Sequence, residues 1–147
     1  MGVQFKLAQK KDIKSLVDLI NECFNEETAH PFAQKIFNQT ERDPNQLHLI
    51  GINDENKLVA YCKITIIPCI FSPTETYAIL DHVCVKPDFR REHIGTHLLE
   101  VAEATAKEHG AHSFVLWSKN SCKAAHALYK KIGFEIFDGP IFEKEFN

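Results

Sequence analysis

Apolar side chains recur along the chain with two periods, one of two residues and one helical, which predicts a mixture of strands and helices. Alternating or continuous apolar runs predict strands at 3–8, 47–52, 58–70, 77–85, 113–117, 134–137 and 141–146. Helical spacing predicts helices at about 10–24, within 25–46, at about 93–109 and at 121–132. A glycine directly after each of the last two helices fits their C-terminal ends.

This order of elements predicts one domain over residues 1–147, of the α/β class. Its mixed central sheet should contain about six to seven strands, flanked by about four helices. The run 113–117 is apolar nearly throughout, which is typical of a strand that is buried on both faces.

Composition narrows the class of protein. A formal net charge of −3 lacks the basic excess of nucleic-acid-binding proteins, so no nucleic-acid partner is expected. No apolar run approaches the ~18 residues of a membrane span, and the N-terminus enters a strand pattern without a signal region, so no membrane partner is expected. Five scattered cysteines without a C-x-x-C pair are typical of free thiols in a reducing compartment, which predicts a cytoplasmic protein.

Candidate chemistry gathers where the strand 77–85 leads through a turn into the next helix. The turn carries Arg90 and Arg91, and the first turn of the helix carries Gly95 and Thr96. The first amides of a helix have no partner within it and form the positive end of its dipole. Such an end binds phosphate, a glycine allows close approach, and the arginines add positive charge. These residues therefore indicate a pyrophosphate site.

Two stretches resemble a known family. Residues 89–99 resemble motif A of the GNAT superfamily, the acetyl-CoA-dependent N-acetyltransferases. Arg90 and Gly95 match that motif, and His93 stands where its first glycine usually lies. Residues 124–134 resemble the family's motif B, and the two motifs occur in family order. The residues in register with motif B are Ala125, Leu128, Tyr129, Gly133 and Phe134.

The resemblance implies the GNAT fold, splayed between the strands 77–85 and 113–117, and acetyl-CoA as co-substrate without a metal. Pantetheine would bind backbone groups of the first strand, and the pyrophosphate would bind the helix start. The cofactor-binding residues implied in this way are Val83, Cys84, Val85, Arg90, Arg91, Glu92, His93, Ile94, Gly95, Thr96, Asn120 and Tyr129. Tyr129 is also the implied catalytic acid, because a phenol with a pKa of ~10 is protonated at neutral pH and can protonate the leaving thiolate.

The attacking amine needs a base, since a primary amine with a pKa of ~10.4 is mostly protonated at pH 7. Asp81 is the first candidate, because relatives often carry an acid on this strand just before the cofactor turn. His82, Glu26 and Glu27 are the alternatives.

The faces of the strand bear on this choice. In a regular strand Asp81 and Val83 share one face and His82 and Cys84 share the other, unless a bulge intervenes. Cys84 has no flanking base in the sequence, and the resemblance implies direct transfer rather than an acyl-enzyme on this thiol.

The resemblance predicts an acyltransferase that moves an acetyl group from acetyl-CoA to a primary amine by direct nucleophilic attack. Residues 66–81 are also similar to small acetyltransferases related to glucosamine-phosphate acetylation, which favours a small-molecule, amino-sugar-like acceptor. Alternatives are a protein lysine or N-terminus, a polyamine, a non-catalytic acyl-CoA-binding module, or a metal-dependent hydrolase built on His93 and His97. Dimers are common in the family, and a homodimer is compatible with the sequence.

Overall fold

The computed structural model describes residues 2–146, and the chain divides between Trp117 and Ser118 into two compact units. The strands of the first unit are β1 (Val3–Leu7), β2 (Gln46–Asn53), β3 (Leu58–Ile67), β4 (Tyr77–Val85) and β5 (Phe114–Val115). Its helices are α1 (Ile13–Phe24), α2 (His30–Thr40) and α3 (Ile94–Glu108), with short 3-10 helices at Lys10–Asp12 and Pro87–Phe89. The second unit contains α4 (Lys123–Lys131).

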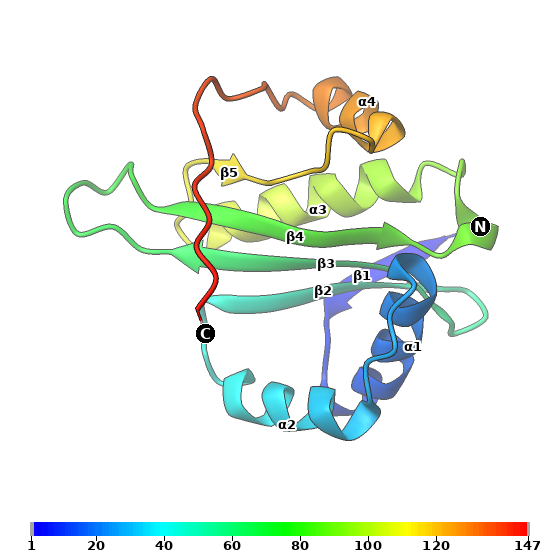
Figure 1. The fold of residues 1–147 in the computed structure, drawn as a ribbon. Coiled ribbons are helices and arrows are strands. Elements are labelled where there is room, and N and C mark those ends of the chain that lie inside the picture. The colour runs from blue at the N-terminus through cyan, green and yellow to red at the C-terminus, as the bar shows by residue number, and fades with distance from the viewer. Residues whose placement is uncertain (1, 147) are drawn as a thin grey trace. The chain divides into compact units, whose positions relative to one another are not determined.

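The strands form one sheet in which spatial order follows chain order, β1-β2-β3-β4-β5 (Figure 1). Neighbours from β1 to β4 are antiparallel, whereas β5 runs parallel to β4. A parallel pair requires a crossover connection, and α3 lies within it. The predicted mixed α/β class is confirmed by this arrangement.

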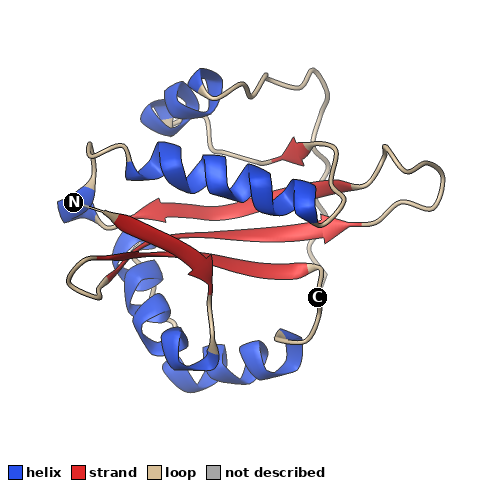
Figure 2. Cartoon of the chain, turned by 180° about the vertical axis from the view of Figure 1, so that it is seen from behind, coloured by secondary structure: helices blue, strands red, loops and turns tan. Residues whose placement is uncertain are grey.

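Helices cover the sheet on both faces, with α1 and α2 on one side and α3 on the other (Figures 1 and 2). On the α1 and α2 side, Leu16 and Val17 belong to one buried cluster with Ile50 and Tyr61. The helix α3 buries Leu98 completely. Side chains of a strand alternate between faces, so β2 contributes apolar residues to both layers.

Most predicted elements are present, and the C-terminal ones are the main exception. The predicted strands 134–137 and 141–146 are wrong, because no strand occurs there within the described residues. Their side chains remain exposed, as at Phe137 and Phe142, which are 88% and 91% exposed. Alternating apolar residues favour a strand only when a partner edge is at hand, and two short segments alone gain too little from pairing. Residues 2–146 therefore contain five strands rather than six to seven.

The strand β5 is shorter than predicted and is not buried on both faces. It covers two residues, and Val115 and Trp117 are 37% and 51% exposed. A strand that pairs along only one edge for two residues leaves its apolar side chains partly open to solvent. All five cysteines are free. Among residues 2–146, no helix combines the length and apolar composition that crossing a membrane requires.

Candidate active site

A bulge in the second half of β4 determines which residues of this strand face the same way. Asp81 pairs with Lys63 and Cys84 pairs with Tyr61, so the bulged strand has one more residue than its partner here. His82, inside the bulge, has a φ of 52°. An extra residue reverses the alternation of side chains beyond it. Asp81 and Cys84 consequently share the face of Lys63 and Tyr61, so the bulge that the sequence left open does intervene and the alternation of a regular strand does not hold here.

The outer edge of β4 separates from β5 soon after the two strands meet. Their ladder consists of two pairs, Ala78 with Phe114 and Ile79 with Val115. The rest of β4, Leu80–Val85, lies outside this ladder. The predicted splay between strands 77–85 and 113–117 is confirmed by this short ladder. An edge of this kind has the backbone groups with which an extended ligand can pair.

The turn after β4 leads into a helix whose first amides have no side-chain cap. Arg90 Nε donates to the carbonyl oxygen of Val85 at 3.0 Å, which folds this arginine against the end of the strand. Arg91 and His93 have φ values of 68° and 62°. His93 is the N-cap of α3, and its side chain makes no capping hydrogen bond. The helix itself begins at Ile94, and its N-terminal amides suit an anion.

The residues predicted to surround the pyrophosphate differ in exposure. Ile94 is buried and fixes the start of α3 on the sheet, whereas Gly95 and Thr96 are half-buried. Glu92 is exposed and carries a negative charge, so only its backbone amide suits a phosphate.

The C-terminal end of α1 is tied to this same turn. Lys86 Nζ lies 2.6 Å from Glu22 Oε2, and that hydrogen bond raises the pKa of Lys86. The Cys23 thiol donates to the carbonyl oxygen of Val85 at 3.6 Å. The loop that follows α1 carries Glu26 and Glu27, both exposed. The sheet and α1 thus fix the place where this acidic loop begins.

A row of polar side chains crosses the sheet on the α1 and α2 face. His48, Lys63 and Asp81 are cross-strand neighbours on β2, β3 and β4. His48 Nδ1 lies 2.8 Å from the Tyr61 hydroxyl, and the two rings are stacked. Burial, and next the positive charge of Lys63, lower the pKa of His48 to about 4. Burial raises the pKa of Tyr61, so this hydrogen-bonded pair is uncharged at neutral pH.

Sequence reasoning missed His48, Tyr61 and Lys63. Their polar groups lie on strands that it predicted, but only the register between strands brings them beside Asp81. His48 and Lys63 interrupt apolar runs, and this interruption was the available signal.

The remaining alternatives on β4 have different surroundings. Cys84 is 7% exposed, and burial raises the pKa of its thiol, which disfavours the thiolate that an acyl-enzyme would need. His82 is exposed, and its ring lies edge-on to Phe24 with 5.5 Å between ring centroids. Among the candidates on β4, only Asp81 is an acid that lies on the same face as the polar row.

Tyr129 and Asn120 belong to the second unit. Tyr129 lies on α4, and its ring centroid is 5.7 Å from that of Phe134. The chain reverses at Gly133, whose φ is 106°. Asn120 is exposed in the turn before the helix. The cofactor and catalytic roles of Tyr129 and Asn120 stay predictions.

Comparisons with known proteins identify the family. The model of the acetyltransferase (GNAT) family matches residues 13–134. The chain belongs to this family. As a GNAT acetyltransferase it is an acyltransferase, which leaves the metal-dependent hydrolase without support. It is 28% identical over 114 residues to an aminoglycoside N(6')-acetyltransferase type 1 of Acinetobacter genomosp. 13, covering 76% of this chain and 75% of that protein.

Solved structures agree on the fold of this acetyltransferase. A transcriptional regulator from Bacillus halodurans C-125 matches with a TM-score of 0.86 at 20% identity, covering 98% of this chain and all of that one. The structure of AAC(6')-Iy in complex with the bisubstrate analogue CoA-S-monomethyl-acetylneamine matches with a TM-score of 0.82 at 14% identity, covering both chains fully. At these identities the likeness shows the GNAT fold alone.

We expect His93→Gly to raise the free energy of unfolding by up to about 1 kcal/mol, because the left-handed conformation strains a side chain and not a glycine. Urea unfolding measures the change. His97→Gly is the matched control: it lies inside α3, where glycine should cost about 1 kcal/mol. Equal losses in both variants would contradict strain at His93.

Stability should depend on pH through His48. The unfolded chain binds a proton at this imidazole near its ordinary pKa of 6.5, whereas the folded protein does so only near 4. The contribution is therefore complete above pH 6.5 and is lost as the pH falls toward 4, by about 3 kcal/mol in total. Urea unfolding at several pH values measures this slope. The slope of stability against pH should flatten in His48→Gln and persist in His97→Gln, an exposed control. An unchanged slope in His48→Gln would refute the assignment of this pH dependence to His48.

Proposed function

We propose that this acetyltransferase transfers an acetyl group from acetyl-CoA to a primary amine of a small, amino-sugar-like molecule by direct attack of the amine on the thioester. The main support for the proposal is that the open edge of β4 leads directly into the start of α3. The strand leaves its ladder with β5 after Ile79, and the chain then turns directly into a helix without a side-chain cap.

These two features suit the two parts of coenzyme A. The extended pantetheine would pair with the backbone of Val83, Cys84 and Val85 as an added strand does. The pyrophosphate would bind the amides of the first turn of α3, where the helix dipole and the two arginines favour negative charge. Backbone groups supply most of these contacts, which is compatible with His93 in place of the motif glycine.

Asp81 is the proposed base. Bringing an amine with a pKa of ~10.4 to its neutral form at pH 7 costs roughly 4.6 kcal/mol, and a carboxylate near the amine lowers that cost by taking the proton. The register supports this role, because the bulge directs Cys84, at the proposed thioester end of the strand, to the same face as Asp81. The exposed carboxylates of Glu26 and Glu27 remain the alternative source of this base.

Tyr129 is the proposed acid, an assignment that rests on motif B. As the amine nitrogen forms its bond to the acetyl carbon, the bond from that carbon to sulfur breaks and coenzyme A leaves as a thiolate. The phenol protonates the thiolate, while the proton lost by the amine goes to the base, so the products are an amide and a free thiol. Burial of the Cys84 thiol favours this direct route over an acyl-enzyme.

An acceptor screen that follows thiol release tests the function. Acetyl-CoA is offered with amino sugars, aminoglycosides, polyamines, a lysine peptide and free N-terminal peptides. We expect fastest release with an amino sugar or aminoglycoside, and calorimetry should detect binding of coenzyme A. Absence of binding would refute the cofactor site. Faster acetylation of peptides than of every small amine would refute the proposed acceptor class.

Variants at the proposed acid and base should lower kcat with the best acceptor. Tyr129→Phe keeps the ring beside Phe134 and removes the hydroxyl, so kcat should fall by about 10²-fold while coenzyme A binding is unchanged. The kcat of Asp81→Asn should fall by a similar factor. It should rise again with increasing pH, since more of the amine is then neutral without a base. Asp88→Asn, in the turn beyond the strand, is the matched control and should retain wild-type kcat. A fully active Tyr129→Phe enzyme would show that another group protonates the thiol.

A further inference from the structure

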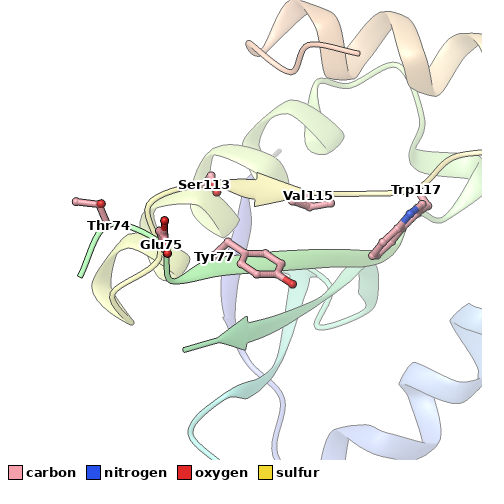
Figure 3. A pocket seen from close by; sticks show the side chains of 6 residues that line it. All are labelled: Thr74, Glu75, Tyr77, Ser113, Val115 and Trp117. Carbon is pink, nitrogen blue, oxygen red and sulfur yellow. The ribbon is translucent and has the colours of Figure 1, made fainter. Parts of the chain in front are cut away.

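A pocket of about 440 Å³ lies along the first part of β4 and along β5 with the residues that follow it. It is lined by Thr74, Glu75, Tyr77, Ser113, Val115 and Trp117 (Figure 3). Its volume lies in the range of sites that take small molecules. The proposed mechanism uses none of these six residues.

The lining combines aromatic surface, one negative charge and hydroxyl groups. In Figure 3, Tyr77 from β4 and Trp117 from the segment after β5 extend to the same side of the sheet. The faces of such rings attract cations and pack against the C–H surface of a sugar. Glu75 is the only charged residue of the six, whereas Asp81 shares its row with the cation Lys63. The pocket therefore favours a positively charged ligand.

The loop that carries Glu75 is held by its own hydrogen bonds. The Glu75 amide donates to the Ser72 carbonyl oxygen at 3.1 Å, and the Cys69 amide donates to Thr76 Oγ1 at 3.0 Å. The Cys69 thiol donates to Glu75 Oε2 at 3.5 Å. These bonds place the carboxylate at the pocket before any ligand arrives.

The pocket opens on the same face of the sheet as the proposed base. Tyr77, Ile79 and Asp81 alternate regularly along β4, because the register with β3 is unbroken from Tyr77 to Asp81. Val115 pairs with Ile79 and so faces the same side. Four residues of strand separate Tyr77 from Asp81, which corresponds to about 13 Å. One ligand of two rings can span this distance, whereas a single ring cannot.

We propose that this pocket is a second acceptor subsite, which binds an amino-sugar ring remote from the amine that is acetylated. The inference rests on the proposed function for the position of the reacting amine. Glu75 binds an ammonium group of the remote ring and Tyr77 packs against its face, whereas Trp117, at the other end of the pocket, packs against the ring that carries the reacting amine. The subsite makes the enzyme selective for amines with at least two rings.

Trp117 is the only tryptophan of the chain, so its fluorescence reports on this pocket directly and without turnover. Titration with neamine, a two-ring amino sugar, should give a saturable change, and glucosamine should require at least a 10-fold higher concentration. Glu75→Gln should raise the Kd for neamine at least 5-fold. Glu108→Gln, on α3, is the matched control and should leave it unchanged. No saturable change, or equal Kd values in both variants, would overturn the subsite.

Turnover and a ring-free amine provide a second readout. Glu75→Gln should raise KM for neamine at least 5-fold with kcat within twofold, and should leave kcat/KM for glucosamine unchanged. Equal affinity of the wild-type protein for spermidine and neamine would overturn the assignment of a sugar ring. The proposed function would be refuted by a different result, the absence of thiol release with every amine. The fluorescence titration measures binding and does not depend on thiol release.

Discussion

The single extra residue in β4 is the constraint on which the rest of the site depends. A bulge bends a strand and increases its twist, while β3 stays paired with β4 on both sides of it. The ladder of β4 with β5 stops after Ile79, before the bulge is reached. The same residue directs Asp81 and Cys84 to one face. One insertion in the backbone thus brings Cys84 to the face of Asp81, next to the edge that is proposed to bind the ligand.

The net charge of −3 conceals how the charged groups are distributed over the two faces of the sheet, where the cation Lys63 and the acid Asp81 lie side by side on one face. The positive features, the start of α3 with Arg90 and Arg91, belong to the helix on one face and the turn that leads into it. The carboxylate of Asp81 faces the other side, and the Glu75 pocket opens there too. In the proposed function, a polyanionic co-substrate would bind at the start of α3 and a cationic acceptor on the Asp81 face, so the two would compete little for the same groups. The uncharged His48–Tyr61 pair adds no charge to the acceptor side at neutral pH.

The local sequence pattern predicted correctly those elements that depend on residues close together in the chain. The helix periodicity, the glycine-ended helices and the extent of β4 follow from residues close together in sequence, and all appear in the structure. The row of His48, Lys63 and Asp81 depends on register across three strands, which no single segment encodes. Alternation suggested strands near Phe137 and Phe142, but pairing also needs a partner edge. His93 shows a further limit. The sequence indicated that His93 stands in place of the motif glycine, but only the structure revealed that its backbone is left-handed.

The two-pair ladder between β4 and β5 also sets where the molecule opens most easily. Strands β2, β3 and β4 form a continuous antiparallel meander with long ladders, whereas β5 contributes two pairs at the sheet margin. Local unfolding proceeds first where the fewest backbone bonds must break. We therefore expect the margin of the sheet next to the proposed cofactor edge to open without disturbing the meander, so that its amides exchange with solvent sooner than those of β3. In the proposed function, the shortest ladder of the sheet thus lies where coenzyme A would enter and leave.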